Sequence, residues 1–331
     1  MNINVLGMGN ALIDIVTELP NDKLLTDLAL RKGSMQLVDR LFSENALSQV
    51  QHLERTEKSG GSAANTICGL GSLGFETAFI GKVGNDRLGE VFQNDLRHYG
   101  VKPLMQFGTT ETGVALTLVS RNGERTFATY LGAAVEMEPI DLNADLFQNY
   151  SHFYIEGYLV QHHELIRKAV ELAKESGLDV VLDLASFNVV EDNLDFLHFL
   201  VKEYADIVFA NTEEAKAFTG LKDPEKALNA IAQDCWIAVV KRGDKGSIIQ
   251  NGKNVYHVPA EKVNCIDTTG AGDLYASGFL YGLFNNMKLS LCGEIGTILA
   301  GKVIEVMGAK IPDAEWPGLK ERIKEVTYKQ L

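Results

Sequence analysis

The chain has 331 residues, of which 46% are hydrophobic and 23% charged, and its formal net charge is −13. These values are typical of a globular protein and fit one large α/β domain with an appendage. The acidic balance argues against general nucleic-acid binding, because that needs a basic surface to contact phosphates. A small anionic ligand is compatible with it, since the groups lining a buried site outweigh the net charge.

The N-terminus and the cysteines bear on the compartment. The stretch MNINVLGMGNALIDIV lacks a basic region and is interrupted by Gly, Asn and Asp, so we expect a first strand there rather than a signal peptide. No apolar run reaches the roughly 18 residues of a membrane span. The cysteines are scattered without a CxxC pair, which favours buried free thiols at Cys68, Cys235, Cys265 and Cys292. We therefore expect a cytoplasmic protein without membrane contact.

Short apolar runs alternate with helical patterns along the chain. The runs are rich in β-branched residues and predict buried strands at residues 3–7, 77–81, 179–184, 206–211 and 236–243. Apolar residues at helical spacing predict one helix over 163–176, stopped by Gly177, and another that starts at the possible N-cap Thr212 and stops at Gly220. This alternation predicts an α/β fold with a doubly wound, mainly parallel sheet flanked by helices.

Residues 112–132 break that alternation. Two β-rich runs are joined there by Asn122-Gly123, a strong signal for a hairpin. A hairpin has no natural place inside a parallel sheet, so we expect it to extend outward as part of a small β-sheet lid. The N-terminal stretches ALIDIVTEL and GSMQLVD could pair with it. The prediction is a single domain over 1–331 with a discontinuous lid, approximately residues 11–40 and 104–132.

The stretch IDTTGAGDLYASGFLYG, residues 266–282, carries the most specific chemistry. Its glycines let the amides of Gly270, Ala271 and Gly272 point into one concavity at a helix N-terminus, which makes an anion site. Phosphoryl transfer needs such stabilisation and a base near the acceptor hydroxyl, a role open to Asp273. A glycine turn with Asp273 as an ordinary helix-start acid explains the stretch equally well.

Two earlier segments place polar side chains beside glycines. In GNALID, Asn10 and Asp14 follow the first strand, where α/β sheets place ligands. In KSGGSAANT, Gly61 allows close backbone approach, and Asn65 offers a donor and an acceptor to a polyhydroxylated substrate. Taken alone, each is better explained as local structure: a turn carboxylate, and a helix start capped by Ser62. GMGNAL also fails as a dinucleotide fingerprint, because its third glycine is absent.

Two later segments offer groups for a nucleotide and its metal. In NTEEAKAF, Glu214 could orient water on Mg²⁺, although acid placement at a helix start fits Glu213 equally well. In KRGDKGS, Gly243 and Gly246 could let the chain pass close to a nucleotide; the alternative is a plain β-turn.

Together these stretches resemble the ribokinase-like (PfkB) family of carbohydrate and nucleoside kinases, in order and over nearly the whole chain. GMGNALID is similar to the family's substrate-binding start, GGSAAN to its glycine loop, and Asn211 with Glu214 to its N-x-x-E motif. DTTGAGD and IGKVGNDRLGE resemble its signatures, the latter through Gly81, Gly84, Asp86 and Gly89. The resemblance implies the ribokinase-like fold with a small β lid, and transfer of the γ-phosphate of ATP to a sugar or nucleoside hydroxyl with Mg²⁺.

The resemblance also implies roles for individual residues. Asp273 would be the catalytic base beside an anion hole of Gly270, Ala271 and Gly272. The acceptor's sugar would contact Asn10, Asp14, Gly61, Ser62 and Asn65. The nucleotide would contact Asn211, Gly243, Gly246 and Thr268, and Glu214 would act on Mg²⁺ through water. Many members use a monovalent cation such as K⁺, and the residues that resemble its site are Asp267, Thr269 and Gly308.

The acceptor is a small molecule whose class the sequence leaves open. GMGNALIDI, TYLGAAVEM, YIEGYL and DTTGAGDLYASGFLYG resemble adenosine kinases, and Tyr158 could stack near a purine. SAAN also suits sugar kinases, so a ribokinase- or fructokinase-like enzyme is the runner-up. A non-catalytic ligand-sensing protein on the same fold is a third hypothesis. The oligomeric state is open between monomer and homodimer.

Overall fold

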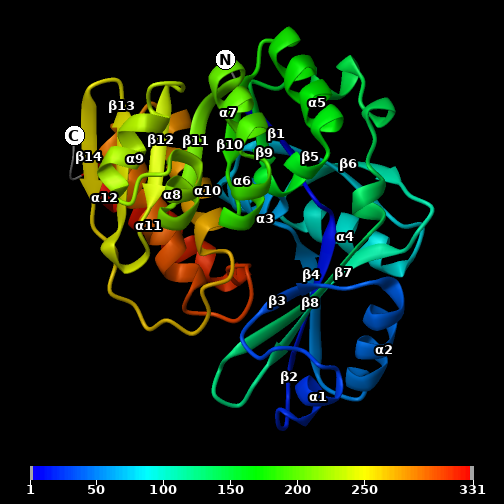
Figure 1. Cartoon of the computed structure of the whole chain (residues 1–331). Coiled ribbons are helices and arrows are strands. Elements are labelled where there is room, and N and C mark those ends of the chain that lie inside the picture. The colour runs from blue at the N-terminus through cyan, green and yellow to red at the C-terminus, as the bar shows by residue number, and fades with distance from the viewer. Residues whose placement is uncertain (1–2, 329–331) are drawn as a thin grey trace.

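The computed structural model describes residues 3–328, and two β-sheets organise this part of the chain (Figure 1). In spatial order the large sheet consists of β14 (Asn254–Val258), β13 (Ser247–Asn251), β12 (Ile237–Lys241), β11 (Ala205–Asn211), β10 (Asp179–Asp183), β9 (His152–Glu156), β1 (Asn4–Met8), β5 (Glu76–Val83) and β6 (Val101–Phe107). Neighbours from β6 to β12 pair in parallel, and β13 and β14 add an antiparallel edge. The predicted doubly wound, mainly parallel sheet is thus confirmed.

Helices cover both faces of the large sheet. One face packs on α5 (His163–Glu175), α6 (Phe187–Asp192), α7 (Leu194–Glu203), α8 (Thr212–Thr219) and α9 (Pro224–Ile231). The other packs on α3 (Ser62–Leu73), α4 (Arg87–His98), α10 (Ala271–Phe284) and α11 (Leu289–Val303), with α12 (Trp316–Tyr328) outside α11. The strand order reverses at β1, and ligands of such sheets bind at the carboxyl ends of the strands near that point.

The second sheet projects from one end of the large one (Figure 1). Its strands, in spatial order, are β3 (Met35–Leu37), β8 (Arg125–Gly132), β7 (Thr112–Val119), β2 (Leu12–Glu18) and β4 (Arg55–Gly60). Alternate side chains of one face, including Ile13, Ile15 and Leu116, share an apolar cluster with α1 (Lys23–Asp27) and α2 (Arg40–Val50). The opposite face carries a register row of Asp14, Ala115, Thr129 and Leu37.

The predicted hairpin is present as β7 and β8, with Gly123 at a φ of 81° in the turn. The two N-terminal stretches pair with it in parallel as β2 and β3. The sheet differs from the expected lid segments in two places, since β4 lies outside both and residues 104–107 belong to β6 in the large sheet. The sequence of β4, RTEKSG, is too polar to show a strand pattern.

The stretch IGKVGNDRLGE connects the large sheet to the second sheet. The Asp86 side chain accepts a hydrogen bond from the Gly89 amide at 2.8 Å and so caps α4. It also accepts bonds from the amide and hydroxyl of Thr112, each at 2.7 Å. One carboxylate therefore fixes the start of β7 to the start of α4.

Some local expectations are wrong. The N-cap of α8 is Asn211, not Thr212, because the Asn211 side chain accepts from the amides of Glu213 and Glu214 at 2.9 Å. Ser62 does not cap α3; the N-cap is Gly61, whose φ is 93°. All four cysteines are free, but Cys265 is exposed. Among residues 3–328, no helix combines the length and the apolar character needed to cross a bilayer.

Candidate active site

Polar side chains gather where parallel strands of the large sheet end. Glu156, Asp183, Asn211 and Lys241 are the last residues of β9, β10, β11 and β12, and Asn10 follows β1 by two residues. Glu156 and Asp183 are register partners, as are Asn211 and Lys241. Because the carboxyl ends of parallel strands share one edge of the sheet, five segments far apart in sequence contribute to one site.

Two cavities lie at this edge. The inter-sheet cavity, about 830 Å³, lies between the second sheet and the ends of β1 and β9, and its lining includes Asn10, Gly61, Ser62, Glu156 and Tyr158. The α10 cleft, about 690 Å³, lies beside the start of α10, and its lining includes Lys241, Gly243, Gly246, Thr268 and Gly272. Both volumes are typical of small-molecule sites. The cavities bring most of the predicted acceptor residues together in one place and most of the predicted nucleotide residues in the other.

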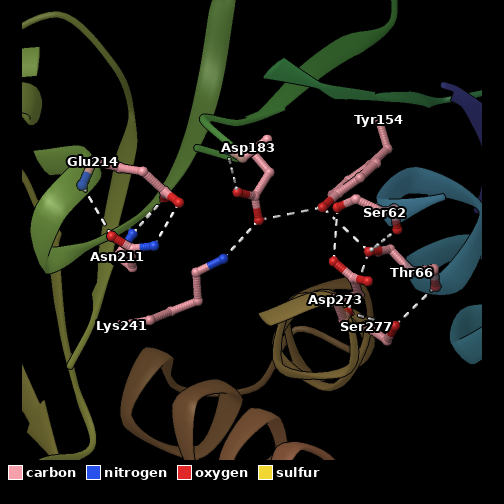
Figure 2. Close-up of polar contacts among 10 residues, drawn as sticks. Ser62, Thr66, Tyr154, Asp183, Asn211, Glu214, Lys241, Asp273 and Ser277 are labelled. Atoms are coloured by element: carbon pink, nitrogen blue, oxygen red, sulfur yellow. Dashed lines mark hydrogen bonds and ion pairs between the residues drawn. The ribbon is translucent and has the colours of Figure 1, made fainter. Parts of the chain in front are cut away.

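Asp273 lies between residues that line the two cavities, and Figure 2 shows its carboxylate beside Ser62 and Thr66. Its Oδ1 accepts a hydrogen bond from the Ser62 hydroxyl at 2.7 Å, and its Oδ2 accepts one from the Asn65 amide at 3.0 Å. Ser62 lines the inter-sheet cavity, and Gly272, the residue before Asp273, lines the α10 cleft. Burial raises the pKa of Asp273 to about 6, against the two hydrogen bonds, which lower it. The carboxylate is thus held ionised at neutral pH, with a basicity above that of an ordinary aspartate.

The start of α10 supplies unpaired amides. Gly270 is the N-cap at a φ of 75°, and a Cβ there would lie 2.7 Å from the Ala309 Cβ, so the position requires glycine. The Ala271 amide donates to the Thr268 carbonyl at 3.2 Å and closes the turn. The next two amides, of Gly272 and Asp273, belong to the first turn, which has no acceptor within the helix. The Ala271 amide, which the sequence predicts to be free, is therefore paired, and the Asp273 amide, which the sequence does not predict, is free of helical partners.

Packing between α3 and α10 fixes the geometry around Asp273. The Ser277 hydroxyl donates to the Thr66 carbonyl at 2.8 Å, and a Cβ at Gly69 would lie 2.4 Å from that hydroxyl oxygen. Thr66 also donates to the Tyr154 hydroxyl at 3.2 Å, as Figure 2 shows. The two helices approach closely enough to hold Asp273 against Ser62 and Asn65.

Glu156 organises the polar end of the inter-sheet cavity. Its Oε1 accepts from the backbone amide of Asn10 at 2.8 Å and from the Asn10 side chain at 3.0 Å, and its Oε2 accepts from the Ala63 amide at 2.7 Å. Burial raises its pKa to about 7. The Asn65 side chain does not line this cavity, and its Oδ1 is a buried acceptor with no partner in the described structure.

Asp14 lies against the glycine loop. A Cβ at Gly60 would lie 2.2 Å from Asp14 Oδ1, so the first glycine of GGSAAN leaves room for this carboxylate. Burial raises the pKa of Asp14 to about 7, Lys310 lowers it, and Asp273 raises it. Asp14 belongs to the register row whose other three members, Ala115, Thr129 and Leu37, line the inter-sheet cavity.

Lys241 is the cation among three carboxylates (Figure 2). Its Nζ lies 2.7 Å from Asp183 Oδ2, and a Cβ at Gly272 would lie 3.1 Å from the same nitrogen. Burial lowers the pKa of Lys241, but Asp183 and Glu214 raise it to a net value above its usual range. The ammonium group therefore stays charged beside the first-turn amides of α10.

Glu214 is positioned by the N-cap of its own helix. Its carboxylate accepts from the Asn211 amide at 2.7 Å and from the Asn211 side chain at 2.5 Å. Burial raises its pKa to about 7, Lys241 lowers it, and Asp183 raises it. The sequence predicts that Asn211 contacts the nucleotide, but Asn211 does not line the α10 cleft. The structure shows instead that Asn211 orients the Glu214 carboxylate.

The acidic groups fit Mg²⁺ held through water. Asp183, Glu214 and Asp273 surround a single ammonium, which leaves an excess of negative charge. Among the described residues, no three His, Cys, Asp or Glu side chains come close enough to one another to hold a metal ion. Mg²⁺ retains several waters and binds phosphates together with one or two carboxylates, which agrees with such a site.

The residues expected to hold a monovalent cation lie together but are already paired. Asp267 Oδ1 accepts from the Thr269 amide at 2.9 Å, and its Oδ2 accepts from the Gly308 amide at 2.6 Å. The guanidinium of Arg125, at the start of β8, forms an ion pair with the same carboxylate. In this structure the three residues therefore do not fit an added cation.

Sequence reasoning missed Glu156, Asp183, Lys241 and Arg125. The first three share one signal, a charged residue that ends an apolar strand of a parallel sheet. Burying a charged side chain costs free energy unless the charge is paired. A charged residue at the end of an apolar strand therefore indicates a paired or functional side chain, and this pattern could have identified the three residues. The role of Arg125 has no comparable local signal, because its partner is 142 residues away along the chain.

Comparisons with known proteins agree with this fold. The sequence matches the model of the pfkB family carbohydrate kinase over residues 35–316. A probable sugar kinase protein from Rhizobium etli CFN 42 is 36% identical, with a TM-score of 0.86 over 98% of this chain and 99% of that one. The adenosine kinase from Sinorhizobium meliloti is 34% identical, with a TM-score of 0.86 over 98% of this chain and 100% of that one. A 5-dehydro-2-deoxygluconokinase from Bacillus licheniformis is 28% identical over 78% of this chain and 86% of its own length.

Proposed function

The chain belongs to the pfkB family of carbohydrate kinases, which use ATP and transfer phosphate to a hydroxyl of a sugar or nucleoside, and from this premise we propose that its acceptor is a purine nucleoside. The finer assignment depends on the shape and lining of the inter-sheet cavity. The adenosine kinase from Sinorhizobium meliloti, 34% identical, supports the same choice.

The observation that carries the proposal is the division of this cavity into a polar and an apolar part. Its polar end lies at Asn10, Ser62 and Glu156, beside Asp273. The rest of the lining is mostly apolar and includes Leu12, Leu37, Ala115, Leu131, Met137, Tyr158, Leu159 and Val189. Its other polar members are Thr129, Ser186 and the run of residues 161–164. A monosaccharide carries hydroxyls on every side and loses hydrogen bonds in apolar surroundings. A nucleoside would place its ribose at the polar end and its base against the apolar walls, with Tyr158 available for stacking.

The acceptor hydroxyl would meet Asp273. A carboxylate with a pKa of about 6 is ionised at neutral pH and can accept the proton as the oxygen attacks phosphorus. Ser62 and Asn65 hold it by one hydrogen bond to each oxygen, which leaves lone pairs on both for the acceptor. Asp273 lies close enough to raise the pKa of Asp14, and Asp14 would bind ribose hydroxyls.

The nucleotide would lie in the α10 cleft. Gly246 has a φ of 79°, and a Cβ there would lie 1.9 Å from the Val258 carbonyl oxygen, so glycine is required where the chain borders the cleft. The phosphates would point to the amides of Gly272 and Asp273, where the α10 dipole and Lys241 add positive potential. Mg²⁺, when bound near Glu214, would neutralise phosphate charge.

An ATP-consumption screen with adenosine, inosine, guanosine, ribose and fructose tests this proposal. A purine has about ten non-hydrogen atoms, and at about 0.3 kcal/mol each they contribute about 3 kcal/mol. We therefore expect kcat/KM for the preferred purine nucleoside to exceed that for ribose by about 10²-fold. Equal or better use of ribose or fructose would contradict the nucleoside assignment.

A sugar kinase is the second candidate, and the names of two relatives favour it. One is a probable sugar kinase protein and the other a 5-dehydro-2-deoxygluconokinase. The same screen separates the two, because a sugar kinase would use fructose or ribose and ignore the nucleosides. Absence of ATP consumption with every acceptor would instead favour a non-catalytic ligand-sensing protein.

A further inference from the structure

Arg125 reaches from the second sheet into the loop that precedes α10. It lies on the face of β8 that also carries Thr129, and it pairs in register with Val119. Its guanidinium forms an ion pair with Asp267 and donates from Nη1 to the Thr269 hydroxyl at 3.1 Å. It also contacts the Met307 sulfur. The Arg125 side chain of the hairpin thus packs against one side of the anion-binding loop that precedes α10.

The pair is buried. The Arg125 side chain is 10% exposed and that of Asp267 is 1% exposed. A carboxylate taken this far from water needs a compensating positive charge as well as hydrogen-bond donors. Two amides supply donors, and Arg125 supplies the only full positive charge that contacts it within residues 3–328.

We propose that Arg125 takes the place of a monovalent cation at Asp267, so that the enzyme works without K⁺ and its second sheet is fastened to the anion-binding loop. Arg125 acts as a positioning residue: it orders Thr269, which directly precedes the N-cap Gly270, and so sets the direction of the amides of Gly272 and Asp273. This inference rests on the proposed phosphoryl transfer at α10.

The Arg125 guanidinium differs from a bound ion because it connects Asp267 to the second sheet. A bound ion would neutralise Asp267 while leaving the second sheet free to move relative to the loop. Arg125 neutralises the carboxylate only while β8 is near the loop, so closure of the inter-sheet cavity and ordering of the anion site become one event. The planar guanidinium of arginine can form two parallel hydrogen bonds to a carboxylate, whereas the ammonium group of lysine cannot. Lysine at position 125 should therefore replace arginine only in part.

The test compares wild type with Arg125→Ala, and with the matched control Arg121→Ala in the exposed turn of the same hairpin. Each full-length protein is melted in equal concentrations of KCl, NaCl and choline chloride. Binding of Tl⁺, a probe for K⁺, is measured by equilibrium dialysis. Wild type and Arg121→Ala should melt at one temperature in all three salts and bind no Tl⁺ at this site. Arg125→Ala should melt lower in NaCl, recover selectively in KCl and bind Tl⁺.

Turnover gives a second readout. Arg125→Ala should lose roughly 10–100-fold in kcat, less than or similar to the roughly 10²–10³-fold that follows loss of a direct oxyanion donor. K⁺ or guanidinium should restore part of it, and Arg125→Lys should be intermediate.

Three results would overturn the inference: selective stabilisation of wild type by K⁺, stoichiometric Tl⁺ binding by wild type, or Arg125→Ala indifferent to K⁺. Should Arg125→Ala fail to fold, the wild-type and Arg125→Lys measurements decide. The cation measurements need no turnover. Failure of the proposed function would appear separately, as wild type that consumes no ATP with any acceptor.

Discussion

Lys241 and Asp183 form an ion pair across the end of β11, with Nζ 2.7 Å from Oδ2. They end β12 and β10, strands that are not neighbours, so their side chains reach over the strand between them. The pair lies next to Glu214 and Gly272, and so places one positive charge among the buried acids and beside the start of α10.

Removal of that charge should destabilise the fold and disable the site. Lys241→Met leaves Asp183 buried without its cation, and breaking a buried pair typically costs about 3–5 kcal/mol. It should also raise the pKa of Glu214 and of Asp273, because Lys241 lowers both. Urea unfolding and the acid limb of the pH–rate profile measure the two effects.

The matched control is Lys216→Met, which removes an exposed ion pair with Glu213 and should cost at most about 1 kcal/mol. The double variant Asp183→Asn/Lys241→Met should recover much of the lost stability, since residue 183 then carries no charge that needs the ammonium. Equal stability of Lys241→Met and wild type would show that the pair contributes little.

Asp273→Asn should abolish most turnover and leave the fold intact. Loss of a general base typically costs about 10²–10⁴-fold in rate. The new amide would face the Asn65 amide, but Asn65 can rotate its side chain and present Oδ1, which has no partner. We expect near-normal thermal unfolding and near-normal ATP binding by calorimetry. Retention of more than a tenth of wild-type kcat would exclude Asp273 as the base, and Asp145→Asn at an exposed site is the control.

The rate should depend on pH through Asp273. Burial raises its pKa from 3.8 to about 6, so the protonated, inactive form persists to higher pH than for an ordinary aspartate. We expect kcat/KM for the acceptor to rise as pH increases through about 6 and then to level off. In Ser62→Ala the limb should move to higher pH, because the Ser62 hydrogen bond lowers this pKa. A profile that stays flat well below pH 6 would contradict the assignment.

The apolar wall of the inter-sheet cavity should decide the acceptor. Ala115 lies between Asp14 and Thr129 in the register row and lines the cavity. Ala115→Phe would fill space assigned to the purine, and should raise KM for adenosine at least about 10-fold, equivalent to about 1.4 kcal/mol. Binding of ATP should not change, because the α10 cleft is separate. Ala144→Phe on the surface is the control, and an unchanged KM for adenosine in Ala115→Phe would place the base elsewhere.

The sequence predicts the architecture well and the site only in part, for a physical reason. Apolar runs locate β1, β5, β10, β11 and β12, because strands of a parallel sheet are buried on both faces. The glycines of DTTGAGD and GGSAAN mark close backbone approach, which is a local property. Strand order is not local, so the contacts of Asp183 with Lys241 and of Arg125 with Asp267 could not be read from the chain. The loss of the Ala271 amide from the predicted free donors depends on a single hydrogen bond, from Ala271 to the Thr268 carbonyl.

The most direct test of the account is a crystal structure with ADP, aluminium fluoride and adenosine, which together imitate the phosphoryl group in transfer. We expect the fluorine atoms, which stand in for the phosphoryl oxygens, to lie about 3 Å from the amide nitrogens of Gly272 and Asp273. The acceptor hydroxyl should lie within about 3 Å of the Asp273 carboxylate. Aluminium fluoride bound away from the start of α10, or an acceptor hydroxyl out of reach of Asp273, would contradict it.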